Sequence, residues 1–320
     1  MTRIRSWLAG HAIDLSFTKG TEPLAAAFAH KGFQDQSLAE LTISFDVDKH
    51  FVTSALKESE NGLFCDRRTG KFAWLSSTPP NVQTLSFDGI SGGNTAFGSF
   101  TLGDIKDLDG SIRTRPGIDI ISAWAANRGI LPIHASGIAL EGRALILLGV
   151  GGSGKTTTAL ALAQRGWELL GDDRCFLYRE GLQIKVASLY ATTFLTSESL
   201  SRLKAGDWPD LGDSRHGKHA RSLPSTARIA ETANLVGGIW VSPDAQSLYK
   251  LQPLSRRQAL VPWQLALSPA LHSLGPSPAL LRGLSDLSHK VVSWRLGLNW
   301  DFDQIDKVFR DMVSRQTNNP

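Results

Sequence analysis

Residues 149–156 read Gly-Val-Gly-Gly-Ser-Gly-Lys-Thr and fit G-x-x-x-x-G-K-[ST], the sequence pattern of a phosphate-binding loop. The apolar residues 144–148 precede this loop and predict a buried strand. Residues 157–164 follow it with apolar positions at helical spacing. A strand, a glycine-rich turn and a helix in this order are the context that the pattern requires, so we expect an α/β fold built around the loop.

The residue types of this loop suit a nucleoside triphosphate. Glycines let the backbone turn and bring its N–H groups close to phosphate oxygens, and the helix N-terminus adds partial positive charge. Lys155 would reach the β- and γ-phosphates, and Thr156 would help to hold Mg²⁺. The expected nucleotide-binding residues are Gly149, Gly151, Gly152, Ser153, Gly154, Lys155, Thr156 and Thr157. The alternative is a glycine-rich turn that binds nothing; the flanking elements favour a site for ATP and Mg²⁺.

The composition is that of an ordinary globular protein, because 42% of the 320 residues are hydrophobic and 20% are charged. The net charge of +4 is small and no long basic run is present, so we expect no nucleic-acid partner. Cys65 and Cys175 lie too far apart in sequence to indicate a disulfide framework or a zinc site, which suits a reducing compartment. No apolar stretch approaches the roughly 18 residues of a membrane span. Residues 1–11 do not form a convincing signal peptide. We therefore expect a cytoplasmic protein without a membrane partner, and a homo-oligomer stays open.

The sequence pattern changes near Pro116, which predicts two domains. Residues 1–115 predict a β-rich N-terminal accessory domain, and residues 116–320 predict a catalytic domain around the phosphate loop. The strands expected in the first domain are residues 41–45, 51–54, 62–65 and 71–75, the last two forming a hairpin. The helices expected in the second are residues 118–127, 197–203, 258–267, 278–288 and 302–315, and its further strands are residues 131–140, 235–241 and 291–297.

Two adjacent carboxylates, Asp172 and Asp173, end a short strand that starts at Glu168 and is expected to continue into residues 175–178. Phosphoryl transfer needs a carboxylate that holds Mg²⁺ and a group that orients or deprotonates the nucleophile. A pair of ordinary turn aspartates is the alternative, and the loop upstream favours the functional interpretation. His134 lies one strand before the loop, where either a hydrogen-bonded structural histidine or a site residue fits.

After the aspartates, residues 175–186 predict a hairpin, which favours a mixed sheet over an ordinary doubly wound one. The polar residues 207–221 contain a cluster of basic side chains and predict a loop. Such a loop would lie over the triphosphate and add positive charge to the transition state, and a solvated loop is the alternative. The basic residues of this cluster are Arg215, His216, Lys218, His219 and Arg221.

The segment 131–176 resembles the HPr kinase/phosphorylase family. The matching residues are His134, the loop 149–156, the turn Arg165-Gly-Trp and the segment Gly171-Asp-Asp. The resemblance implies a P-loop kinase domain with a mixed sheet, related to that of phosphoenolpyruvate carboxykinase. It implies ATP-dependent phosphorylation of a serine on a protein or peptide acceptor. The chain is also similar to divergent relatives of this family that modify peptides.

By matching positions, the resemblance implies roles for single residues. Asp172 would activate the acceptor hydroxyl, and Asp173 would join Thr156 at the metal. His134 would line the site, and Arg221 or Lys218 would take the place of an arginine that the family carries later in its sequence. No counterpart of the family's C-terminal signature follows Asp173, so the acceptor itself is not implied.

Two other functions stay open beside the serine kinase. One is a small-molecule phosphotransferase or carboxykinase-like enzyme, and the other is a regulator that binds ATP and transfers nothing. The adjacent Asp172 and Asp173 favour an enzyme, since a mere binder needs only one metal carboxylate. The large β-rich N-terminal region favours a macromolecular acceptor over a metabolite.

Overall fold

The computed structural model consists of two compact units. The described residues are 1–30, 38–58, 62–66, 71–77, 80–87, 95–104, 108–213, 217–243, 251–274, 278–298 and 300–315. The first unit comprises Met1–Ala125, Leu189–Thr192 and Asp210–Ser222, and the second comprises Ala126–Ser188, Thr193–Pro209 and Leu223–Pro320. The chain thus passes between the units more than once, and the division into domains after residue 115 stays a prediction.

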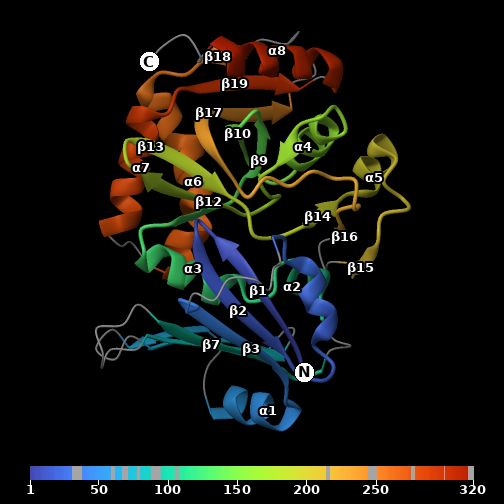
Figure 1. Ribbon diagram of the computed structural model, residues 1–320, viewed down its shortest axis with the longest axis vertical. Coiled ribbons are helices and arrows are strands. Elements are labelled where there is room, and N and C mark those ends of the chain that lie inside the picture. Colours follow the sequence, from blue (N-terminus) through green and yellow to red (C-terminus); the bar gives the residue numbers. More distant parts are fainter. Residues whose placement is uncertain are drawn as a thin grey trace. The chain divides into compact units, whose positions relative to one another are not determined.

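The first unit contains a mixed seven-stranded sheet in the order β1-β2-β3-β7-β6-β5-β4 (Figure 1). Its strands are β1 (Thr2–Leu8), β2 (His11–Phe17), β3 (Leu41–Val47), β4 (Gly62–Asp66), β5 (Lys71–Ser77), β6 (Pro80–Phe87) and β7 (Ala96–Leu102). β3 runs parallel to both β2 and β7. On its buried face the rings of Phe17 and Phe45 stack with 4.7 Å between centroids, and Phe100 lies 5.6 Å from Phe45. The expected β-rich N-terminal region is confirmed, as is the β4–β5 hairpin.

One expected strand of this unit, residues 51–54, is wrong: these residues belong to helix α1 (Lys49–Glu58). The Asp48 carboxylate accepts a hydrogen bond from the Phe51 amide at 2.9 Å, as an N-terminal cap does. Val52 is fully buried, while the Phe51 side chain is exposed. A cap and one anchoring side chain therefore outweigh the strand propensity of a short β-branched run.

The remaining elements of the first unit are η1 (Glu22–Ala27), α2 (Gly110–Thr114), β15 (Asp210–Asp213) and β16 (His219–Ser222), and helix α3 (Ile118–Asn127) spans its end. The loop expected over residues 207–221 is thus in part an antiparallel strand pair. Polar side chains meet across the pair: His219 Nδ1 lies 2.8 Å from Asp213 Oδ1, and Arg221 forms an ion pair with Asp210. Such cross-strand pairs stabilise a hairpin, and composition alone did not indicate them. Arg215 and His216 lie outside the described residues.

The second unit contains a nine-stranded sheet whose main order is β11-β9-β10-β17-β13-β12-β8, with β19 beside β17 and β18 beside β19. Its strands are β8 (Leu131–Ile133), β9 (Ser136–Leu140), β10 (Arg143–Leu148), β11 (Glu168–Leu169), β12 (Cys175–Glu180), β13 (Gln183–Ala187), β17 (Thr232–Pro243), β18 (Leu251–Pro253) and β19 (Ser293–Leu298). β17 is parallel to β10 and β19, and β12 and β13 form an antiparallel hairpin. The predicted mixed α/β character is confirmed.

Helices cover both faces of this sheet (Figure 1). They are α4 (Lys155–Ala163), α5 (Ser197–Leu203), α6 (Arg256–Leu274), α7 (Pro278–Lys290) and α8 (Phe302–Arg315). Along β10, Ala144, Ile146 and Leu148 face the α6–α7 layer, and Leu145 and Leu147 face the layer of α4 and α8. A continuous apolar strand is what burial on both faces demands. Among the described residues, no helix is long and apolar enough to cross a membrane.

Two expected strands of this unit are divided by turns. The strand expected at residues 131–140 breaks at His134, and its two halves pair with different neighbours, β12 and β10. The strand expected to run from Glu168 into Cys175 also breaks, since β11 pairs with β9 and β12 pairs with β8 and β13. Each break puts a polar side chain of the candidate site in a turn.

Candidate functional site

The loop 149–154 joins β10 to α4, as the sequence pattern predicts. Gly149, Gly152 and Gly154 have φ angles of 150°, 78° and 95°, in the region that glycine adopts most readily. A Cβ atom on Gly149 would lie 2.8 Å from the carbonyl oxygen of Val241 on β17. All three positions favour glycine because of their backbone angles, and Gly149 and Gly154 also leave no room for a Cβ atom.

The tip of this loop is open to a ligand. A Cβ atom on Gly151 or Gly152 would meet nothing within 4 Å. Val150, the residue before Gly151, is 57% exposed. Within the described residues, the amides of Gly151, Gly152 and Gly154 donate to no acceptor. Gly154 is also the N-cap of α4 and offers no side chain to the first-turn amides. Unpaired amides at a helix N-terminus form an anion-binding site.

Lys155 lies beneath this loop. Its Nζ donates to the carbonyl oxygens of Gly149 at 2.8 Å and Val150 at 3.1 Å. Only 6% of the residue is exposed, so its charge is held close to the loop backbone. The hydroxyl of Ser153 is buried and has no hydrogen-bond partner among the described residues. The loop therefore combines a cation with open amides, which suits a phosphate group.

Asp172 is a buried carboxylate to which three hydroxyl groups donate. Ser136 Oγ and Thr156 Oγ1 bond its Oδ1 at 2.6 and 2.8 Å, and Thr193 Oγ1 bonds its Oδ2 at 2.6 Å. These donors come from β9, from the first turn of α4 and from strand β14 (Thr192–Leu195). The bond to Thr156 ties Asp172 to the start of α4, directly after the loop 149–154. Hydrogen bonds to a charged acceptor are among the stronger ones, so this carboxylate is firmly held.

Asp173 points to a different set of partners. Its Oδ1 lies 2.9 Å from His134 Nε2, and its Oδ2 lies 3.2 Å from Arg174 Nη1. Its side chain is 23% exposed, so it is open to solvent where Asp172 is not. Asp173 has φ 63° and Gly171 has φ 105°, and these left-handed residues turn the two carboxylates to different partners.

Cys175 directly follows this turn and is fully buried. Its Sγ contacts the carbonyl oxygens of Ala135 at 3.5 Å and Gly171 at 3.8 Å. Burial, and then the nearby Asp172 carboxylate, raise the pKa of the Cys175 thiol far above its usual range. Because the thiolate is the nucleophile, this cysteine supports the turn and does not supply a reactive sulfur.

The structure brings together most residues that the sequence predicted for the site. Thr156 meets Asp172, His134 meets Asp173, and Thr157 Oγ1 lies 2.8 Å from Ser199 Oγ on α5. Three residues that the sequence did not predict, Ser136, Thr193 and Arg174, complete the two carboxylate clusters. Arg174 could have been predicted, because it directly follows the two aspartates in the sequence. No sequence pattern links Thr193 to Asp172.

Arg221 belongs to the first unit, whereas the other predicted site residues belong to the second. Its guanidinium pairs with Asp210 and donates to the carbonyl oxygen of Ala220 at 3.0 Å. The role of Arg221 in the site stays a prediction.

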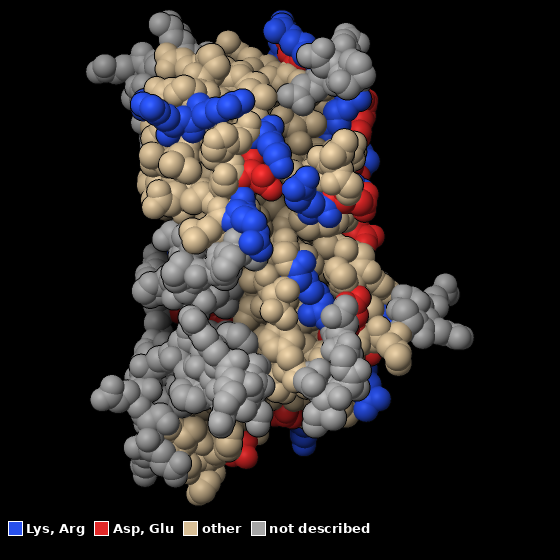
Figure 2. Space-filling model, turned by 90° about the vertical axis from the view of Figure 1, so that its left-hand side faces the viewer, with Lys and Arg blue, Asp and Glu red and all other residues tan. Residues whose placement is uncertain are grey.

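Figure 2 shows Lys and Arg side chains spaced over one face of the molecule, with Asp and Glu side chains between some of them.

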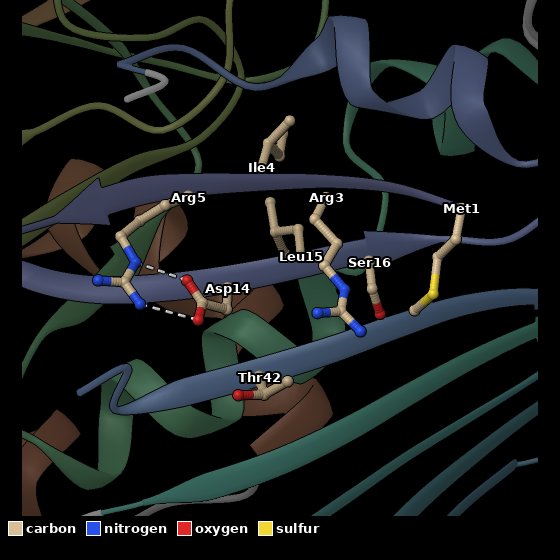
Figure 3. Close-up of a pocket in the computed structure, with 8 residues that line it drawn as sticks. All are labelled: Met1, Arg3, Ile4, Arg5, Asp14, Leu15, Ser16 and Thr42. Atoms are coloured by element: carbon tan, nitrogen blue, oxygen red, sulfur yellow. Dashed lines mark hydrogen bonds and ion pairs between the residues drawn. The ribbon is translucent and has the colours of Figure 1, made fainter. Parts of the chain in front are cut away.

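A separate cavity of about 460 Å³ lies in the first unit, on the face of β1, β2 and β3 (Figure 3). Arg5 contacts Asp14 there through two bonds of 2.6 and 2.9 Å, so its charge is neutralised. Arg3 has no ion-pair partner among the described residues. The interactions of its lining side chains join no nucleophile to a base. By contrast, Asp172 bonds Thr156 at the start of α4, and Asp173 contacts His134.

Comparison with known proteins gives limited similarity. A family model described as "SynChlorMet cassette protein ScmC" matches residues 111–205, which is less than half of the chain. No curated protein matches. Among solved structures, the Hpr(Ser) kinase/phosphatase from Coxiella burnetii is matched with 14% identity and a TM-score of 0.33, over 58% of this chain and 99% of that chain. A likeness of this size supports no conclusion about function, so the contacts of this chain must carry any functional proposal.

Proposed function

We propose that this chain transfers the γ-phosphoryl group of ATP to a serine hydroxyl on a protein or peptide acceptor. The observation that carries the proposal is the hydrogen bond from Thr156 to Asp172, because it joins the first helical turn after the phosphate loop to a buried carboxylate. A second carboxylate, Asp173, lies beside it with a histidine partner. Phosphoryl transfer needs these parts: a phosphate cradle, a metal carboxylate and a group that takes the acceptor proton.

The contacts of Asp172 fit a magnesium site. Magnesium takes oxygen ligands at about 2.0–2.1 Å in an octahedron, so two neighbouring ligands lie about 3 Å apart. Thr156 Oγ1 and Asp172 Oδ1 are 2.8 Å apart. No group of three or more His, Cys, Asp or Glu suited to a metal is found among the described residues, and a magnesium ion that also binds phosphate oxygens needs only one carboxylate. When bound, the ion would neutralise charge on the phosphates.

The contacts of Asp173 fit the group that receives the acceptor proton. This carboxylate is partly exposed, and His134 and Arg174 hold its two oxygens in place. In the reaction, the serine oxygen attacks the γ-phosphorus, the bond to the β-phosphate oxygen breaks, and the serine proton passes to Asp173. Lys155 would compensate charge on the β- and γ-phosphates. The family resemblance implies the opposite division, with Asp172 as base and Asp173 at the metal; the contacts favour Asp173 as the base.

The two aspartates can be told apart by binding and turnover together. Asp173→Asn should leave Mg²⁺-dependent ATP binding near that of the unmodified protein and lower phosphoryl transfer at least about 100-fold, as loss of a general base does. Asp172→Asn should raise the Mg²⁺ concentration that ATP binding requires. Calorimetric titration of ATP at several Mg²⁺ concentrations measures this. If Asp172→Asn abolishes transfer with unchanged Mg²⁺ dependence, the roles are those that the resemblance implies.

The small-molecule phosphotransferase and the non-catalytic regulator remain the competing functions. Both alternatives predict ATP binding, as the proposed kinase does. The three functions are therefore told apart by which molecule, if any, receives the phosphoryl group. The matching family model is named for a cassette protein, which makes the polypeptides encoded beside this gene the first acceptors to test. A kinase of the proposed kind labels a serine on one of them with the γ-phosphate of ATP.

A further inference from the structure

Trp300 packs against the phosphate loop from the side of β19 and α8. A Cβ atom on Gly154 would lie 2.8 Å from Trp300 Cη2 and 2.6 Å from Leu298 Cδ1. Trp300 itself has φ 68°, a left-handed angle that is rare for a bulky residue. Its indole is half-buried. One part of the ring packs against the core cluster of the second unit, and the strained backbone holds the ring beside the loop.

The indole has a cationic neighbour. The guanidinium carbon of Arg202 on α5 lies 4.6 Å from the centroid of the Trp300 ring. Glu198, one turn earlier on α5, contacts Arg202 at 2.6 Å and fixes its direction. The ring of Phe302 meets Trp300 edge-on at 6.2 Å. Trp300 and Arg202 therefore form a partly exposed cation–π pair, which we term the Trp300–Arg202 platform.

The platform adjoins the start of α4, since Trp300 lies close to Gly154, the N-cap of this helix. Lys155 and Thr156 serve the β- and γ-phosphates and the metal, and Thr156 faces Asp172. The next residue, Thr157, bonds Ser199 on α5, so α5 and its Arg202 are tied to the first turn of α4. A nucleotide with its terminal phosphates at Thr156 and Asp172 would have its nucleoside within reach of Trp300, which lies close to the loop at Gly154.

The geometry points to a base-binding subsite: we propose that the Trp300–Arg202 platform stacks on the purine ring of the bound nucleoside triphosphate. Indole and guanidinium groups both stack on bases through their planar faces. This subsite rests on the proposed function, since it takes the base of the nucleotide whose phosphates the loop would hold.

Two probes separate the base from the phosphates: ATP, and inorganic tripolyphosphate, which has no base. In calorimetric titrations with Mg²⁺, Trp300→Ala should weaken ATP binding about 10-fold, within the range that base stacking supports. Tripolyphosphate binding should change less than about twofold, because the loop amides and Lys155 remain. Trp300→Phe keeps an aromatic face and should keep most of the affinity. The preference for ATP over CTP should shrink in Trp300→Ala, because a pyrimidine offers less stacking area.

Arg202→Met tests the same subsite without disturbing the contact between Trp300 and Gly154, and it should weaken ATP binding but not tripolyphosphate binding. The chain offers a matched control: Trp240 and Arg295 form a similar pair at 5.6 Å across β17 and β19. Trp240→Ala should leave ATP binding unchanged. Equal losses for ATP and tripolyphosphate in Trp300→Ala would overturn the subsite and leave Trp300 as a support of the loop. If the unmodified protein binds neither probe, the proposed function fails and the subsite fails with it.

Discussion

The hydroxyl cluster around Asp172 makes a quantitative prediction for Thr193→Val. This change replaces a hydroxyl with a methyl group of similar size and keeps the β-branched shape of a residue in β14. It removes a bond of 2.6 Å to a carboxylate that is 6% exposed. A hydrogen bond to a charged group contributes about 1.5–3 kcal/mol, and Asp172 keeps two other donors. We expect the free energy of unfolding to fall by about 2 kcal/mol, which is roughly a 30-fold change in the folding equilibrium.

Urea denaturation followed by intrinsic fluorescence measures this loss, since the fully buried Trp167 and Trp263 belong to the same unit as Thr193. Thr193→Ser keeps the hydroxyl and should lose less stability. The neighbouring Thr192 is a matched control, because its hydroxyl donates to the uncharged carbonyl of Thr114 at 2.6 Å. Thr192→Val should cost only about 0.5–1.5 kcal/mol. If Thr193→Val costs no more than Thr192→Val, Asp172 is not a charged acceptor held by this cluster.

Three further outcomes follow from the loop and its neighbours. Lys155→Ala should weaken ATP binding itself, and an unchanged ATP dissociation constant would refute the assignment of the loop. Gly154→Ala should lower the free energy of unfolding by about 2–4 kcal/mol, because Gly154 has a left-handed backbone angle and its Cβ atom would clash with Leu298 and Trp300. Gly151→Ala, the control, should change this free energy by less than about 0.5 kcal/mol, because its Cβ atom meets nothing. Equal stabilities of the two variants in urea would contradict the loop geometry. Cys175 should resist iodoacetamide at pH 8 in the folded protein, because its raised pKa keeps the thiol protonated, and should react once urea unfolds the chain. Mass spectrometry of the Cys175 peptide measures this, and rapid labelling of the folded protein would show that the thiol is not buried.

The parts of the fold that follow from local sequence were the predictable ones. Glycine spacing and flanking apolar runs placed the loop between β10 and α4. The predicted helices at residues 118–127, 197–203 and 302–315 match α3, α5 and α8 at their observed ends. The hairpin after the aspartates correctly indicated a mixed sheet. These features depend on residues close in sequence, so a pattern is enough to find them.

The parts that depend on distant contacts were not predictable. Residues 51–54 have strand composition; the capping Asp48 is a local helix signal that this composition hid, whereas the burial of Val52 depends on the folded unit. The two aspartates share a short segment, yet their different partners come from β9, α4, β14 and the turn after β8. Because Thr193 and Ser136 reach Asp172 only through the folded sheet, no spacing rule singles them out. The residue pattern itself gave no division of roles between the two aspartates; the family resemblance implied Asp172 as base and Asp173 at the metal, and that division stays untested.

The proposed kinase activity is tested by transfer of the γ-phosphate of labelled ATP to serine in the polypeptides encoded beside this gene. We predict that the unmodified protein with Mg²⁺ produces phosphoserine on one of them. We also predict that Asp173→Asn, which should still bind ATP, produces almost none. If the unmodified protein binds ATP but labels no polypeptide, or if Asp173→Asn transfers phosphate at the unmodified rate, the proposed kinase site is contradicted.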